Sequence, residues 1–323
     1  QPERHGDEAS VGIDLMHTVN GWFSYNAGLH GSVFHSNQLF WACDPRITFH
    51  FYPAENHEIS LHAGSYTQFF HKAGLTGGGL PTDFFMLADS TLQAERAIGT
   101  SLRYSASFFN KKWTLQAEGY FKQLYGVVES LGNIVQLINQ GFDYEKYLIT
   151  GAGRNYGLNL MLQRDKGIIT GYISYSLGWA KRKLPELDGS QEYIYSASHE
   201  RRHDLNIVLN ARFAKRWTVG GQFVLASGLP YTKAEEAYIL NGNMICRYST
   251  FNGAHMPLYN RLDLSCSCDI IKTQDHELGI NLSLYNVYCH KNAQFVVYRE
   301  NLKPIMRTTL STIIPSISIY GKF

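Results

Sequence analysis

The sequence predicts an all-β fold whose antiparallel strands form the wall of a transmembrane β-barrel. Three observations predict it. Apolar and polar residues alternate along many segments, short and long connections follow one another in turn, and residues 311–323 alternate up to the terminal Phe323. A period of two gives a strand one apolar and one polar face. A barrel supplies a partner for such a terminal strand, whereas an open edge in a soluble sheet invites aggregation.

The composition of the 323 residues agrees with this prediction. Aromatic residues make up 14% and charged residues only 17%, and the mean hydropathy is −0.22. No run approaches the 18 apolar residues that a membrane helix needs. These values also fit a soluble β-sandwich or propeller, so composition alone leaves both classes open. The net charge of +2 gives no reason to expect a nucleic-acid partner. Residues 1–8 are polar and show no signal peptide, so we expect a mature chain or a fragment.

Period-two segments predict about thirteen strands, each of a length that suits a tilted crossing of a bilayer. In residues 113–121, for example, Trp113, Leu115 and Ala117 oppose Thr114 and Gln116. The predicted spans are 9–17, 21–34, 45–53, 57–70, 97–109, 113–128, 151–164, 168–182, 202–213, 217–228, 259–271, 276–289 and 309–323.

The connections between these strands sort into two kinds. Tight polar links fall near 18–20, 54–56, 110–112, 165–167, 214–216 and 272–275, and longer links lie between them. Antiparallel order then places every short turn at one end, as in outer-membrane barrels with short periplasmic turns. Trp22, Trp113 and Trp217 each follow a short turn, which predicts an interfacial aromatic girdle. A chain with an odd number of strands that ends at the periplasmic side would begin at the extracellular side. Bacterial single-chain barrels have an even number of strands, which places both termini on one side, so we expect the C-terminal part of a larger barrel.

No catalytic or metal site is predicted. Seven histidines lie between residues 17 and 71 without a metal-binding spacing. His50 and His62 fall on the lumen-facing side of neighbouring strands and leave haem or metal capture as a minor alternative. The five cysteines include Cys266 and Cys268, which share one face of a strand. A disulfide among Cys43, Cys246 and Cys289 is allowed, although the sequence does not favour one.

An ordered set of short motifs carries a family likeness. The motifs are 80–83 (LPTD), 93–97 (QAERA), 153–158 (GRNYGL), 201–206 (RRHDLN), 227–232 (SGLPYT), 257–264 (PLYNRLDL), 284–288 (LYNVY), 291–292 (KN) and 295–298 (FVVY). Together they resemble the C-terminal barrel of TonB-dependent outer-membrane receptors, particularly those of Bacteroidetes. Asn260 stands where that family usually has a histidine, which removes a titratable group.

The resemblance implies a barrel of roughly 22 strands with a plugged lumen. It implies uptake of a nutrient such as a siderophore, cobalamin, glycan or peptide, and no enzymatic activity or cofactor. We expect residues 1–323 to be a single barrel segment in the outer membrane of a Gram-negative bacterium, with no plug domain. Expected partners are membrane lipid, the TonB–ExbB–ExbD system acting through a plug outside this sequence, and a surface lipoprotein, but no nucleic acid. The alternative is a self-contained passive porin of 12–14 strands, and an outer-membrane enzyme or adhesin ranks behind it.

Two groups of residues are candidates for the site. Aromatic side chains in the long connections suit ligand binding: Tyr144, Tyr147, Tyr193, Tyr195, Tyr231, Tyr238 and Tyr248. The structural family motif comprises Arg202, His203, Asp204, Arg261, Asp263, Asn286 and Phe323. We expect the charged members to contact the wall or a plug rather than to form a catalytic cluster.

Overall fold

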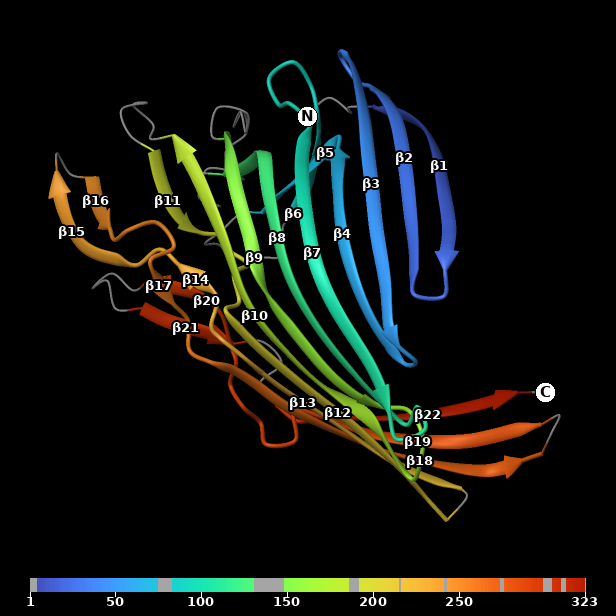
Figure 1. Ribbon diagram of the computed structural model, residues 1–323. Coiled ribbons are helices and arrows are strands. Elements are labelled where there is room, and N and C mark those ends of the chain that lie inside the picture. Colours follow the sequence, from blue (N-terminus) through green and yellow to red (C-terminus); the bar gives the residue numbers. More distant parts are fainter. Residues whose placement is uncertain are drawn as a thin grey trace.

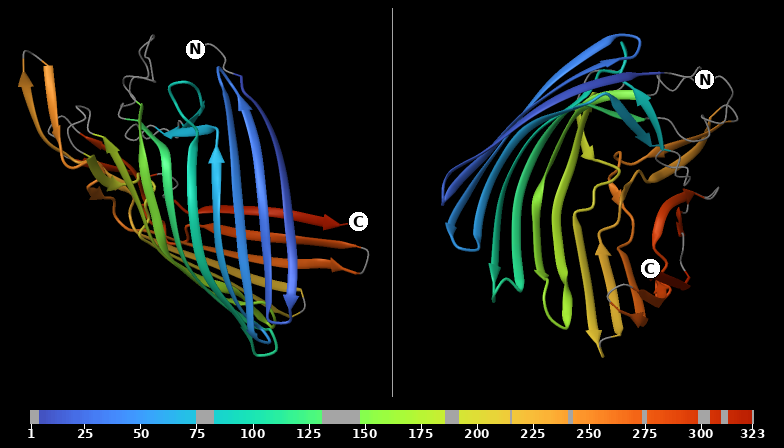
Figure 2. Two further views of the ribbon diagram at one scale, coloured as in Figure 1. Left: turned by 45° about the horizontal axis from the view of Figure 1, so that its top comes forward. Right: turned by 90° about the vertical axis from the view of Figure 1, so that its right-hand side faces the viewer.

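The computed structural model describes residues 5–74, 83–130, 148–185, 192–214, 216–240, 243–273, 276–298, 304–308 and 312–322. All regular elements in these ranges are β-strands. No helix among the described residues is long and apolar enough to cross a membrane. Most strands join one large antiparallel sheet that curves into a trough (Figures 1 and 2).

Thirteen strands run in order across this sheet, as predicted, and their bounds differ from the prediction by a few residues. They are β1 (Asp7–Asn20), β2 (Phe23–His35), β3 (Leu39–Ala54), β4 (His57–Gln68), β7 (Glu95–Phe108), β8 (Trp113–Ser130), β9 (Leu148–Arg164), β10 (Ile169–Pro185), β12 (His203–Phe213), β13 (Trp217–Ala226), β18 (Tyr259–Lys272), β19 (Glu277–Tyr285) and β22 (Ile314–Lys322). Each pairs with the next of these strands, so the short turns gather at one end and the long connections at the other. The link between β2 and β3 is an exception at the long-connection end: the prediction placed it at 35–44, but it comprises only residues 36–38 because β3 begins at Leu39.

The long connections hold further short strands that the sequence prediction missed. Four pairs form small sheets of their own, and β11 extends the edge of β10. These strands are β5 (Phe70–Gly74) with β6 (Asp83–Leu87), β14 (Pro230–Tyr231) with β17 (Ala254–His255), β15 (Ala234–Leu240) with β16 (Asn243–Tyr248), β20 (Ala293–Tyr298) with β21 (Pro304–Thr308), and β11 (Glu192–Ser196).

The register fixes which side chains share a face. In one row Phe121 of β8 lies opposite Thr100 and Tyr156, and in another Glu118 lies opposite Arg103 and Asn159. The first row belongs to an apolar face and the second to a polar face. The polar side chains of β4 and β12 line one common cavity although four strands lie between them, so the polar face is the concave, lumen-facing one.

The wall itself buries little, and the described hydrophobic core is a small cluster at the long-connection end. Phe34, Phe40 and Phe69 pack around Ala88, with the rings of Phe34 and Phe69 stacked at 5.1 Å. Hairpin β5–β6 contacts β8 beside this cluster. The cluster therefore fixes one long connection onto the rim of the sheet.

The two edges of the sheet do not meet. Within the described residues β1 pairs only with β2 and β22 only with β19, and these edge strands lie apart in Figure 1. All fourteen residues of β1 are exposed. The described sheet is therefore open between its first and last strands.

Several predicted side-chain positions can be checked against this wall. Trp22, Trp113 and Trp217 lie at the short-turn end. Trp22 stacks on Phe51 and Trp113 on Phe108, and Trp217 lies opposite Cys268 on the neighbouring strand. Both Cys266 and Cys268 are free thiols on the apolar face, as predicted. Exposed Cys43 and Cys289 are also free. A disulfide that includes either of them is therefore absent, and the side chain of Cys246 and all of Phe323 lie outside the described residues.

Candidate lumen-facing binding site

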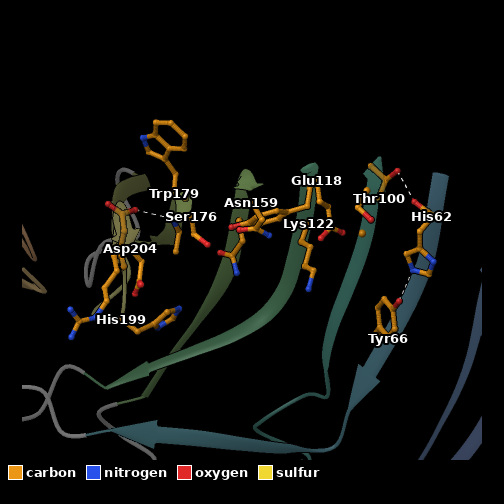
Figure 3. A pocket seen from close by; sticks show the side chains of 18 of the residues that line it. His62, Tyr66, Thr100, Glu118, Lys122, Asn159, Ser176, Trp179, His199 and Asp204 are labelled. Atoms are coloured by element: carbon orange, nitrogen blue, oxygen red, sulfur yellow. Dashed lines mark hydrogen bonds between the residues drawn. The ribbon is translucent and has the colours of Figure 1, made fainter. Parts of the chain in front are cut away.

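A cavity of about 770 Å³ lies on the polar face (Figure 3). Its walls come from β4, β7, β8, β9, β10 and the start of β12, because successive rows of inward-pointing residues meet across the curved sheet. The lining side chains include His62, Tyr66, Ser101, Glu118, Tyr120, Lys122, Asn155, Asn159, Ser176, His199, Glu200, Arg201, Asp204 and Asn206. Hydroxyl, amide and charged groups of both signs therefore face one space.

On one side, His62 is held between two hydroxyl groups. Its Nδ1 lies 2.9 Å from Thr48 Oγ1 and its Nε2 lies 2.7 Å from Tyr66 Oη. A neutral imidazole has one donor and one acceptor nitrogen, so both contacts can be satisfied without a proton being added. His50 shares the same face and bonds to Glu58 at 2.8 Å. The described residues contain no group of three or more His, Cys, Asp and Glu side chains placed to hold a metal ion.

The middle of the cavity offers side chains with spare hydrogen-bonding capacity. Glu118 and Lys122 point from β8 into it (Figure 3), and neither has an ion pair within the described part of the chain. Asn159 of β9 lies directly opposite Glu118. This part of the wall can accept or donate hydrogen bonds and can contact a ligand of either charge.

The far side of the cavity rests on a buried arginine. Arg182 is only 5% exposed. Its Nη1 donates to Asn155 Oδ1 at 2.9 Å and to the Lys181 carbonyl at 3.1 Å, and its Nη2 lies 3.4 Å from His199 Nε2. Burial and the neighbouring Arg182 charge lower the pKa of His199, which favours the neutral form of this loop histidine.

Glu200 connects the cavity wall to the strand edge. Its carboxylate accepts from the Ala180 amide at 2.8 Å and from Ser196 Oγ at 3.1 Å, and its side chain is 2% exposed. Arg202 Nη2 lies 3.2 Å from the same carboxylate. Lys181 Nζ lies 3.6 Å from it as well. Because these described contacts all come from the wall, Glu200 has a structural role at this rim.

The adjacent motif residues Arg202, His203 and Asp204 do not converge. Arg202 packs over the Trp179 ring at 5.4 Å, and His203 Nδ1 contacts Tyr175 Oη at 2.7 Å on the apolar face. Only Asp204 lines the cavity. Arg202 precedes β12, and His203 and Asp204 at the start of β12 point to opposite faces, so this triplet is not one cluster.

The other motif residues do converge, at the end of β18. Asp263 accepts from Arg261 Nε through Oδ2 and from the Asn286 amide through Oδ1, both at 2.9 Å. Arg261 also donates to the hydroxyls of Tyr259 and Tyr285 at 3.0 Å. Asn286 is 1% exposed, with a φ of 53° and an amide side chain bonded to the His290 backbone. These contacts fix the start of the connection after β19.

The candidate tyrosines are dispersed. Tyr193 stacks on buried Tyr195 at 6.5 Å, whereas Tyr238 and Tyr248 are exposed on hairpin β15–β16. Tyr231 lies on β14 and is half-buried. Tyr144 and Tyr147 lie outside the described residues. Burial raises the pKa of Tyr195, whose hydroxyl has no partner among the described groups.

Sequence reasoning did not select Glu118, Lys122, Asn159 or Glu200 as site residues. Glu118 and Lys122 share the even-numbered positions of Thr114 and Gln116, so the alternation of this strand places them on its polar face. That placement is the one feature of the sequence that could have identified them. Their gathering around one cavity depends on the curvature of the sheet, which a period of two does not encode.

Comparisons with known proteins agree on the fold. No protein-family model and no curated protein match the sequence. Among solved structures, the FrpB iron transporter from Neisseria meningitidis matches 99% of this chain with a TM-score of 0.62 and 13% identity. The ferripyoverdine receptor of the outer membrane of Pseudomonas aeruginosa matches 98% with a TM-score of 0.60 and 8% identity. The ferric citrate transporter FecA matches 98% with a TM-score of 0.62 and 10% identity.

The chain spans less than half of these proteins: 46%, 39% and 45% of their respective lengths. At such low identity the likeness establishes the architecture, which extends over nearly all of the chain. This chain therefore has the antiparallel barrel-wall fold of TonB-dependent outer-membrane receptors.

Proposed function

We propose that this chain is the C-terminal part of the barrel of a TonB-dependent receptor, of the Bacteroidetes type, that imports a nutrient across a Gram-negative outer membrane. The observation that carries the proposal is the likeness to receptor barrels over 98–99% of the chain. The open sheet supports it, because a self-contained porin needs its first and last strands to pair. The polar cavity wall then faces the lumen, where a plug or a ligand would contact Glu118 and Lys122.

Transport, rather than chemistry, is the proposed activity. The neighbours are described as an iron transporter, a ferripyoverdine receptor and a ferric citrate transporter. Iron chelates are therefore the first ligands to test, ahead of cobalamin, glycans and peptides. In this proposal energy comes from the TonB–ExbB–ExbD system through a plug, and a surface lipoprotein is a further partner.

Uptake of radiolabelled ferric chelates by cells that express the complete receptor tests the proposal. We expect saturable uptake that disappears when TonB is deleted. Planar-bilayer conductance separates this activity from a porin, because a plugged receptor conducts little whereas a porin forms a stable open channel. Uptake that is unchanged without TonB, or a stable open channel in the bilayer, would refute the proposal.

A further inference from the structure

On four neighbouring strands, the outward-facing side chains change from apolar to polar at about the same height. Along β7, β8, β9 and β10 the outward positions are mainly apolar from the short-turn end upward, and then polar side chains follow. The outward residues at this change are Arg96 on β7, Gln123 on β8, Arg154 on β9, and Lys181 and Lys183 on β10. Strands β1–β4 carry no cation at the outward positions on this level.

The height of this level above the tryptophan girdle matches a membrane. Gln123 lies ten residues after Trp113 on the same face of β8, about 33 Å along the strand. A tilt of about 45° reduces this to about 23 Å, close to the roughly 25 Å apolar band of outer-membrane barrels. Arg154 lies directly opposite Gln123. The cations are therefore level with the headgroups of the outer leaflet.

Two of these cations keep their charge available. Arg96 Nε donates to Ser65 Oγ at 3.2 Å, and Arg154 Nε donates to Gln123 Oε1 at 2.9 Å. Both side chains are exposed, and neither forms an ion pair with another described residue. Lys181 differs, because it contacts Ser196 and lies 3.6 Å from buried Glu200. The neutral partners orient Arg96 and Arg154 and leave their positive charge uncompensated.

An apolar groove lies next to the two arginines. It measures about 750 Å³ and crosses β2, β3, β4, β7 and β8, and small side chains at Ala27 and Ala63 form part of it. Ile47, Ile98 and Phe121 add apolar walls, and Arg96 and Gln123 also line it. A groove with an apolar floor and a cationic rim fits an amphiphile with an anionic head and an acyl chain.

We propose that this outer face binds lipopolysaccharide, the phosphorylated glycolipid of the outer leaflet, with lipid A phosphates on Arg96 and Arg154 and an acyl chain in the groove. Guanidinium groups favour phosphate because they can form paired charged hydrogen bonds. Arg96 and Arg154 lie two strands apart, about 10 Å in the pairing direction, so each can contact a different phosphate. The inference requires the outer-membrane embedding proposed above but is independent of the transported nutrient.

Native mass spectrometry of the complete receptor, purified from the outer membrane and delipidated in detergent, tests the site. The probes are bisphosphorylated lipid A, the same lipid without phosphates, and phosphatidylglycerol. We expect lipid A to bind the unmodified protein, and the double variant R96Q/R154Q to bind it about a hundredfold more weakly, roughly tenfold per charged contact. R164Q is the matched control, because Arg164 lies on the same face of β9 at the opposite end.

The outcomes distinguish lipid A from phosphatidylglycerol as the ligand, and the lipid-binding proposal from the transport proposal. Preference for phosphorylated lipid A, lost in R96Q/R154Q and kept in R164Q, supports the site. Equal binding by the double variant, equal loss in R164Q, or equal affinity for phosphatidylglycerol overturns it. TonB-dependent uptake is measured on the same variants, so failure of the transport proposal is visible separately from failure of lipid binding.

Discussion

At the scale of single residues, Asp263 links two neighbouring groups at the end of β18. It accepts from Arg261 and from the buried Asn286 amide. We expect Asp263→Asn to lower the free energy of unfolding by about 1–3 kcal/mol, because the Asn286 amide loses a charged acceptor. Hydrogen exchange should rise at residues 286–292. Asp204→Asn is the control, since among the described residues the Asp204 carboxylate accepts only from the Asn206 side chain. Unchanged protection in Asp263→Asn would contradict this role.

Gly279 is required by a close approach on the lumen side. A Cβ at this position would collide with the ring of Tyr320, whose hydroxyl donates to Asp269. Gly279→Ala should displace that ring and destabilise the pairing of β19 with β22 by about 1–3 kcal/mol. Gly119→Ala is the matched control, because a Cβ there meets nothing within 4 Å. Thermal unfolding in detergent compares the two, and equal midpoints would contradict the steric argument.

At the scale of elements, hairpin β5–β6 depends on a neutral histidine. His71 is 1% exposed, and its Nε2 lies 2.8 Å from the Gln93 carbonyl. Burial lowers the pKa of His71 below its ordinary 6.5. Below pH 6.5, His71 binds a proton more readily in the unfolded segment than in the folded one. The stabilisation of the folded hairpin by neutral His71 therefore decreases as the pH is lowered.

Hydrogen exchange over residues 69–74 and 83–92 measures this effect after correction for the intrinsic pH dependence of exchange. We expect protection to decrease between pH 7.5 and pH 5.5. His71→Gln keeps a donor near the Gln93 carbonyl but cannot titrate in this range, so its protection should not change. A decrease of equal size in both proteins would exclude His71 as the cause.

The same scale separates what sequence could predict from what it could not. Long alternating strands such as β8 and β9 were predicted to within three residues at each end, because one face meets an apolar and the other a polar environment along most of the strand. Hairpin β15–β16 was missed, since its strands are short and their residues lack this contrast. The cavity was missed for another reason: Glu118 and Asp204 come together only when the sheet curves. Arg261 and Asp263 were selected by family likeness, and their link to Asn286 follows from the turn after β19.

At the scale of the whole molecule, the open sheet is the feature with the largest consequence. Every inner strand has partners on both sides, whereas β1 and β22 each leave one row of backbone groups unpaired within the described residues. Unpaired backbone groups cannot be left in the hydrocarbon of a membrane, because each costs several kcal/mol. Membrane embedding and the open sheet are therefore compatible only when further strands cover both edges.

Cysteine cross-linking tests that arrangement in the membrane. In a background with the native cysteines replaced by serine, I13C on β1 is paired with I317C on β22. A disulfide needs Cα atoms within about 7 Å, so no cross-link should form when other strands separate these edges. I13C with L29C is the positive control, because Ile13 and Leu29 are direct partners between β1 and β2. Efficient cross-linking of I13C to I317C would instead mean that the two edges meet, which is the geometry of a small closed porin and not of a larger receptor barrel.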